Sequence, residues 1–254
     1  TIILWWIINV SDRYMVTYFI SSSANGLYTA ASKIPNFVIL FSQIFIDAWQ
    51  LSADDEYDQE GGRQFFTKVF RVYSGGIFAV ASVLILLCQF ITKILVAKSY
   101  YDSWQFVPIL IIATTFSCIV NFLASIYMAE KKNVMSLVTA MSGAITNFVL
   151  NLVFIPRIGA NGAALATVCA FLVVFVTRAI DTRRFIKIDF KLPVLLGETA
   201  VLVTQSILLL KYDGTLWVYI IEVLLVVVML LLNLKPIKEL VNLILAKFLK
   251  KRKN

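Results

Sequence analysis

The sequence contains no histidine, and charged residues are scarce. Only 15% of its 254 residues are charged, whereas 60% are hydrophobic. Without an imidazole, histidine-based acid–base catalysis, metal ligation and proton relay are excluded within this sequence. The three cysteines, Cys88, Cys118 and Cys169, lie in different apolar segments without the spacing of a metal site, and we expect them to pack as small apolar residues. We therefore expect no metal site and no cofactor.

Long apolar runs dominate the sequence instead. The mean hydropathy is +0.84, whereas a soluble domain is nearer half apolar. A spanning helix needs about 20 mostly apolar residues. Eight segments qualify: 1–20, 27–49, 66–96, 104–128, 134–155, 161–180, 193–210 and 215–234. None alternates like a membrane strand, so the sequence predicts an all-α polytopic membrane protein. Gly75-Gly76 is expected to break the long third span.

The distribution of lysine and arginine predicts the orientation in the membrane. Seventeen of the 23 basic residues, Arg178 among them, follow the second, fourth, sixth and eighth predicted spans. The alternate loops hold Lys98, Arg157 and Lys211. By the positive-inside rule, the first set and the C-terminus face the cytoplasm. The net charge of +8 follows from this topology, so we do not expect nucleic-acid binding.

The basic tail, residues 236–254, has its own apolar pattern. Ile237, Leu240, Val241, Ile244, Leu245 and Phe248 recur at helical spacing, away from the lysines. This pattern favours an amphipathic helix on the inner leaflet, attracted by anionic membrane lipids. An ordinary solvated tail is the alternative.

Polar side chains follow one face of each of the first two spans. In the first span, Asn9, Asp12 and Arg13 fall within roughly 120° of one another on a helix. A charge at the bilayer centre costs at least about 2.5 kcal/mol, so this stripe should face a wet cavity or a protein partner. The second span has a similar stripe, and its Pro35 is expected to kink the helix. That stripe comprises Thr29, Ser32, Lys33, Asn36, Gln43, Asp47 and Gln50.

The two stripes allow two interpretations. In one, buried ion pairs, Arg13–Asp47 or Asp12–Lys33, only fix the helix positions. In the second interpretation, the two helices line a cavity. The amide side chains of the stripes and Pro35 favour this second interpretation. Arginine makes bidentate contacts to phosphate and lysine acts as a point charge, so a cationic cavity suits a phosphate or pyrophosphate group.

Later spans add weaker polar and small-residue patterns. Asn121 and Asn147 lie in milder polar stripes of the fourth and fifth spans. In the sixth, Gly162, Ala166 and Ala170 recur at every fourth position. Small residues at this spacing predict close helix packing in a membrane.

Two segments resemble bacterial polysaccharide flippases, of the superfamily that also contains multidrug exporters. The segment INVSDRYMVTYFISSSANGLYTAASKIPNFV is similar to the start of the family's C-terminal half, through Asp12-Arg13, Gly26, Tyr28 and Ala30-Ala31. The segment FIPRIGANGAALATVCAFLVVFVTR looks like a late loop-and-helix signature, through Gly159, Gly162, Ala163, Ala164 and Thr167.

The resemblance implies a six-helix lobe over residues 1–185 and two additional spans over residues 186–235. We expect the chain to be the C-terminal half of a longer protein, whose N-terminal lobe completes a central cavity. The family moves undecaprenyl-pyrophosphate-linked oligosaccharides across the bacterial cytoplasmic membrane by alternating access.

On this resemblance, the polar residues of the spans take separate roles. Arg13 and Lys33 attract the head group. Asp12 or Asp47 binds a coupling cation, Na⁺ or H⁺, or locks a gate. Further hydrogen bonds to sugars are expected from Asn9, Asn36, Gln43, Asn121 and Asn147.

Three other functions compete with the flippase hypothesis. A multidrug exporter would be expected to have an acidic cavity for organic cations, whereas the mid-span charges here are mixed. A membrane glycosyltransferase or polymerase needs catalytic groups in sizeable outer loops, and the outer loops here have only a few residues. A receptor or structural protein does not need polar stripes on several helices. We therefore expect a transporter rather than an enzyme.

Overall fold

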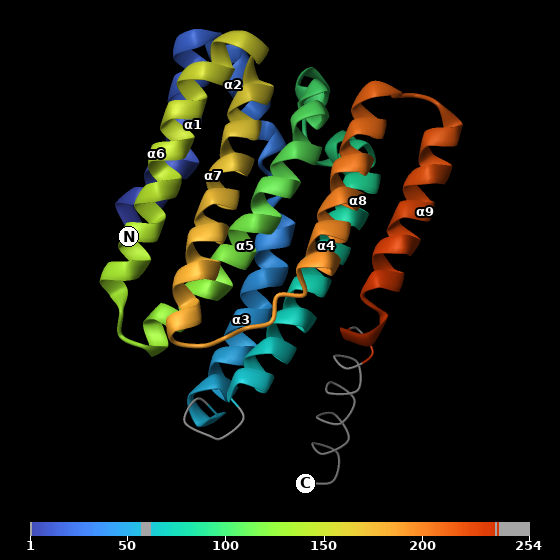
Figure 1. Cartoon of the computed structure of the whole chain (residues 1–254). Coiled ribbons are helices and arrows are strands. Elements are labelled where there is room, and N and C mark those ends of the chain that lie inside the picture. Colours follow the sequence, from blue (N-terminus) through green and yellow to red (C-terminus); the bar gives the residue numbers. More distant parts are fainter. Residues whose placement is uncertain (1, 57–61, 237, 239–254) are drawn as a thin grey trace, which may run out of the picture.

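The chain folds into a bundle of helices (Figure 1). The computed structural model describes residues 2–56, 62–236 and 238, and within them every regular element is helical. The elements are α1 (Ile2–Phe19), α2 (Ser22–Ala31), α3 (Asn36–Glu56), α4 (Gly62–Leu95), η1 (Lys98–Phe106), α5 (Val107–Ala129), α6 (Asn133–Ile158), α7 (Ala160–Asp181), η2 (Thr182–Arg184), α8 (Leu192–Lys211) and α9 (Leu216–Leu232). The predicted helix of the basic tail falls almost wholly outside the described residues.

Most of these helices are long and apolar enough to cross a membrane. Five meet this condition, and α2 with α3 forms a sixth, bent span. The two other predicted spans correspond to α1, which carries Asp12 and Arg13, and to α9, an apolar helix of 17 residues. The chain is therefore an all-α, multi-pass membrane protein.

The predicted break of the third span at Gly75-Gly76 is wrong. Helix α4 runs without interruption from Gly62 to Leu95. Glycine weakens a helix by about 1 kcal/mol relative to alanine, but here it serves tertiary packing. A Cβ atom on Gly75 would overlap the side-chain oxygen of Asn233, which follows α9. The missing side chain thus lets the end of α9 lie against α4.

Pro35 has the predicted effect. Residues 32–35 form a turn between α2 and α3, and the two helices are bent by 41° relative to each other. Proline has no amide hydrogen to donate within a helix, and its ring clashes with the preceding turn. Lys33 lies in this break, where its side chain is exposed.

Helices α6 and α7 pack closely through the small residues that the sequence indicates. Gly162, Ala166 and Ala170 are all buried. A Cβ atom on Gly162 would lie 2.5 Å from the backbone carbonyl carbon of Phe154 in α6. The chain turns between the two helices at Gly159, whose φ of +66° is readily adopted by glycine. The predicted small-residue contact is confirmed.

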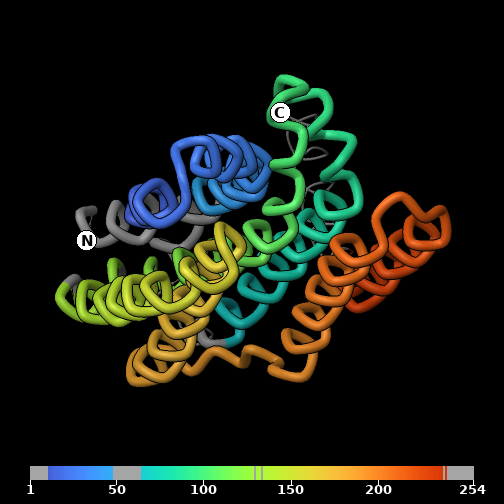
Figure 2. Tube along the Cα trace, turned by 90° about the horizontal axis from the view of Figure 1, so that it is seen from above, coloured from blue at the N-terminus to red at the C-terminus, as the bar shows by residue number. Residues whose placement is uncertain are grey.

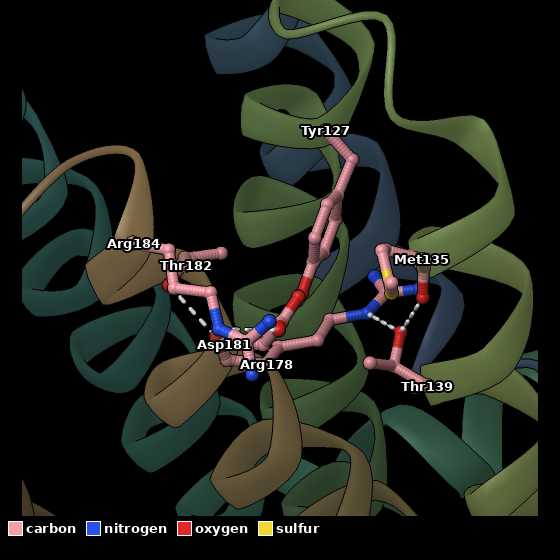
Figure 3. Close-up of polar contacts among 7 residues, drawn as sticks. All are labelled: Tyr127, Met135, Thr139, Arg178, Asp181, Thr182 and Arg184. Carbon is pink, nitrogen blue, oxygen red and sulfur yellow. Dashed lines mark hydrogen bonds and ion pairs between the residues drawn. The ribbon is translucent and has the colours of Figure 1, made fainter.

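A buried arginine ties α5, α6 and α7 together at the opposite end of α7 (Figure 3). Arg178 donates to the backbone oxygen of Val120 at 2.7 Å and to Oγ1 of Thr139 at 3.1 Å. Its guanidinium carbon also lies 5.8 Å from the ring centre of Tyr127, which donates to Asp181 at 2.9 Å. From the sequence, Arg178 is predicted to follow the sixth span. That placement is wrong, because its side chain is 0% exposed inside α7.

Helices α8 and α9 form a hairpin at one edge of the bundle, away from α1 and α6 (Figures 1 and 2). The hairpin is attached to α4 by a buried polar contact. Gln205 of α8 donates to Glu222 of α9 at 2.8 Å and accepts a hydrogen bond from Ser82 of α4 at 2.8 Å. Whether residues 186–235 act as a region separate from the lobe stays a prediction.

The α6–α7 contact yields a stability prediction. Gly162→Ala should lower the free energy of unfolding by about 1–3 kcal/mol, because its Cβ has no room against the α6 backbone. Thermal unfolding can be followed with a thiol-reactive dye, since all three cysteines are free and at least partly buried. Gly197→Ala is the matched control, because a Cβ there meets its nearest neighbour at 3.9 Å. Equal melting temperatures for the two variants would contradict the close contact.

Candidate functional site

Asp12 is the centre of a buried polar cluster between four helices. Its side chain is 4% exposed. Oδ1 accepts a hydrogen bond from Asn151 of α6 at 2.6 Å. Oδ2 accepts from Thr167 of α7 at 2.6 Å and from Tyr28 of α2 at 3.3 Å. One carboxylate of α1 therefore holds three other helices.

The other side chains of the cluster lie at helical spacing on α6 and α7. Asn147 and Asn151 are four residues apart on α6, and the amide of Asn151 also donates to Asn147 Oδ1 at 3.0 Å. Asn147 donates in turn to Thr167 at 3.2 Å and accepts from Ser11 at 3.3 Å. Thr167 lies one turn beyond Ala163 in α7 and donates to its backbone oxygen at 2.9 Å. The close α6–α7 packing brings these side chains within reach of α1.

Two features of the cluster are compatible with a cation or a proton at this position. Within the described part of the chain, no basic side chain forms an ion pair with Asp12. In addition, Oδ1 of Asn151 is buried without a hydrogen-bond partner. Carboxylate, amide, hydroxyl and carbonyl oxygens suit a hard cation. A single carboxylate fits Na⁺ or H⁺ better than a divalent ion, which usually takes more acidic ligands.

Arg13 projects into a pocket beside this cluster. The pocket has a volume of about 260 Å³, and Asp12, Tyr28 and Thr167 also line it. Arg13 itself is half-buried. The remaining polar lining comes from the α2–α3 turn, α3 and α5 and comprises Ser32, Asn36, Thr114 and Ser117. The pocket thus combines one guanidinium with amide and hydroxyl groups.

The other predicted site residues lie elsewhere. Lys33 is exposed in the α2–α3 break and is absent from the lining of this pocket. Gln43 and Asp47 are exposed on α3, where Gln43 donates to Asp47 at 2.7 Å. Asn121 is exposed on α5, whereas Asn147 is fully buried in the Asp12 cluster. Asn9 belongs to α1, but its side chain lies outside the described part of the structure.

The ion pairs considered from the sequence do not form among the described residues. Asp12 binds Asn151 and Thr167 rather than Lys33, and Asp47 binds Gln43 rather than Arg13. Sequence reasoning also missed Asn151, Thr167 and Tyr28 as partners of Asp12. The pairing of Asn147 with Asn151 at helical spacing was the available signal, since it marks one polar face of α6.

Comparisons with known proteins bear on the fold. No protein-family model matches the sequence, and no curated protein matches it significantly. Among solved structures, the chain is similar to one described as the lipid II flippase MurJ in an inward closed conformation, with a TM-score of 0.63 and 17% identity. The similarity covers 94% of this chain and 52% of the flippase chain. The chain thus shares the all-α fold of part of that structure and spans about half its length.

The cluster yields a second stability prediction. Asp12→Ala should lower the free energy of unfolding by about 3 kcal/mol or more, because Asn151, Thr167 and Tyr28 lose their acceptor in a buried site. Asp12→Asn should cost clearly less, since its amide oxygen still accepts hydrogen bonds. Thermal unfolding in detergent distinguishes the two. If Asp12→Ala melts at the wild-type temperature, Asp12 does not hold the four helices together.

Proposed function

We propose that this chain is one lobe of a flippase that carries an anionic, lipid-linked head group across the membrane by alternating access. The expected cargo is an undecaprenyl-pyrophosphate-linked oligosaccharide, and the protein's expected place is the bacterial cytoplasmic membrane. The observation that carries the proposal is Arg13, a half-buried cation in a polar pocket of an otherwise apolar bundle. The similarity in fold to a lipid II flippase supports it.

Arg13 has the chemistry that a pyrophosphate requires. A guanidinium offers two parallel donors to a pair of phosphate oxygens. Within the described residues, no hydrogen bond or ion pair engages the Arg13 side chain, so its donors are available to a ligand. Ser32, Asn36 and Thr114 add neutral donors along the same walls. The acidic group of the pocket, Asp12, is already engaged by Asn151 and Thr167.

The size of the pocket suggests that this lobe supplies part of a larger cavity. Sites for small molecules usually measure about 300–1,000 Å³, and the pocket here has about 260 Å³. It can hold a pyrophosphate but not a whole oligosaccharide. Because the chain spans about half of the similar flippase, we propose that a second lobe encloses the sugars.

The charge distribution supports an orientation. The basic residues of the α5–α6 connection and of the η2–α8 segment lie at the end of the bundle where α9 also ends (Figure 1). Lys98, Arg157 and Lys211 are near the other end. By the positive-inside rule, the first end and the C-terminus face the cytoplasm.

We further propose that the Asp12 cluster holds the coupling ion. Asp12, Asn147, Asn151 and Thr167 would bind Na⁺, or Asp12 alone would hold a proton. The concentration gradient of such an ion across the membrane can drive transport in one direction. Because Asp12 and Arg13 are adjacent on α1, occupancy of the cluster and of the pocket would affect the same helix.

A multidrug exporter of the same superfamily is the alternative. It would use the same fold, but with an acidic pocket that attracts organic cations. The cation in this pocket is Arg13, and the carboxylate beside it is buried and hydrogen-bonded. These observations favour an anionic cargo. The similarity in fold to a flippase favours transport over an enzymatic function.

The pocket predicts different roles for Arg13, which lines it, and Lys33, which does not. In proteoliposomes containing the full-length protein and a labelled pyrophosphate-linked lipid, Arg13→Ala should slow transfer between leaflets about tenfold or more, because a charge-assisted contact is lost. Lys33→Ala should have a smaller effect, since Lys33 is exposed outside the pocket. Arg157→Ala is the control, because Arg157 is exposed at the C-terminal end of α6 and does not line the pocket. An unchanged rate for Arg13→Ala would refute the head-group site.

The Asp12 cluster predicts ion dependence. Wild-type transfer should accelerate under an inward Na⁺ or proton gradient, and Asp12→Asn should abolish that acceleration while the protein remains folded. Asp47→Asn is the matched control, because Asp47 is an exposed carboxylate bonded to Gln43 on α3. If the Asp12→Asn variant still responds to the gradient and the Asp47→Asn variant does not, the coupling site lies on α3 and not at Asp12.

A further inference from the structure

A charged cleft lies at the basic end of the bundle, apart from the Asp12 cluster and the Arg13 pocket. It consists of two hollows of about 300 and 470 Å³ that share Arg71, Lys235 and Pro236. Helix α4, the segment before α8, the first turns of α8 and the residues after α9 form its walls. In Figure 1, α8 begins and α9 ends beside the lower half of α4.

The cleft has an excess of positive charge. It is lined by four basic residues, Lys68, Arg71, Lys191 and Lys235, and by two acidic residues, Asp189 and Glu198, which leaves two positive charges. Asp189 is already engaged by Lys191, through the backbone N–H at 3.0 Å and the ammonium at 3.3 Å. The hydrogen bond from the Lys191 backbone lowers the pKa of Asp189, so this carboxylate is ionised.

Arg71 and Lys235 are available to a ligand. Among the residues whose placement the structure gives, no hydrogen bond or ion pair engages the guanidinium of Arg71 or the ammonium of Lys235. Glu198, 2% exposed, balances part of the charge, but it lies deep in the smaller hollow and interacts with Asn233. Arg71 lies on α4 and Lys235 follows α9, and both line each hollow, so one anion there can contact both.

The walls of the cleft are held in place before any ligand binds. The backbone N–H of Asp189 donates to Thr67 of α4 at 3.3 Å, which attaches the segment before α8. Asn233 donates to the backbone oxygen of Met229 at 3.0 Å and lies against Gly75, where a side chain would clash. A preformed site loses less entropy on binding.

The smaller hollow also has an apolar wall that continues onto the outer surface of the hairpin. Val194, Leu195, Leu231, Leu232 and Leu234 line it. Several neighbouring side chains are exposed, with Leu196 67% and Leu231 57% accessible. In a membrane protein such surface faces lipid tails. The cleft thus joins a phosphate-binding charge pattern to a lipid-facing surface.

We propose that this cleft binds the phosphate group of an anionic phospholipid, with Arg71 and Lys235 as its contacts. The apolar wall favours a lipid over a free phosphate. The lipid would link α4 to the end of α9 and so hold the hairpin on the lobe. This site is independent of the proposed transport function and does not involve Arg13.

Binding can be measured on the delipidated full-length protein in neutral detergent. Short-chain phosphatidylglycerol and inorganic phosphate are titrated separately, and the rise in melting temperature gives each Kd. We expect saturable binding of phosphatidylglycerol, weakened about tenfold for each cation removed and hence about a hundredfold in Arg71→Ala/Lys235→Ala. Lys98→Ala/Lys211→Ala, two exposed cations near the opposite end, should leave the Kd unchanged.

Two results would overturn the proposal. An equal Kd in Arg71→Ala/Lys235→Ala and wild type would show that the cleft is not the lipid site. Inorganic phosphate that binds as tightly as phosphatidylglycerol would show that the ligand is a soluble phosphate. If the double variant does not fold, Lys235→Ala alone serves, because Lys235 is exposed. Arg13→Ala should keep lipid binding, so failure of the transport proposal does not affect this test.

Discussion

The buried carboxylate of Asp12 is the constraint on which the arrangement of α1, α2, α6 and α7 depends. A carboxyl group inside an apolar bundle is stable only when protein groups replace its water. Asn151, Thr167 and Tyr28 do so, each from a different helix. These contacts fix the rotation of α1 about its axis, and the next residue, Arg13, is thereby directed into the pocket. Asp12 thus fixes the helix arrangement, and the next residue, Arg13, provides the proposed head-group contact.

Buried polar contacts connect the helices of this apolar protein. The Asp12 cluster lies between α1, α2, α6 and α7, and Arg178 connects α5, α6 and α7 near their opposite ends. The contact between Gln205 and Glu222 joins the hairpin to α4. Lipid gives no hydrophobic driving force for helix association, so small residues and polar contacts carry specificity. The polar groups thus determine which helices are neighbours, while Gly162 determines how closely two of them approach.

Much of the fold could be predicted from the sequence, because span length and hydropathy are local properties. The kink at Pro35 and the close packing at Gly162 are also local signals, and both are present in the structure. The partners of Asp12 could not be predicted. Asn151 lies 139 residues away in the sequence, and the sequence does not indicate which of the polar residues in other spans contacts Asp12. The prediction that α4 breaks at Gly75 was wrong for a related reason. Gly75 lies within a continuous helix, and its lack of a side chain leaves room for Asn233, a distant residue that follows α9. Arg178 was misplaced because a basic residue near a span end usually reaches water, whereas here it finds carbonyl and hydroxyl acceptors.

The central claim is that the pocket beside Asp12 selects an anionic head group on a lipid. The most direct test compares two labelled lipids in proteoliposomes of the full-length protein, one with a pyrophosphate linkage to its sugar and one with a neutral linkage but the same tail. Loss of each label from one leaflet is followed over time. The account predicts transfer of the pyrophosphate-linked lipid and little transfer of the neutral one. Equal transfer of both, or no transfer together with uptake of a cationic dye, would contradict it.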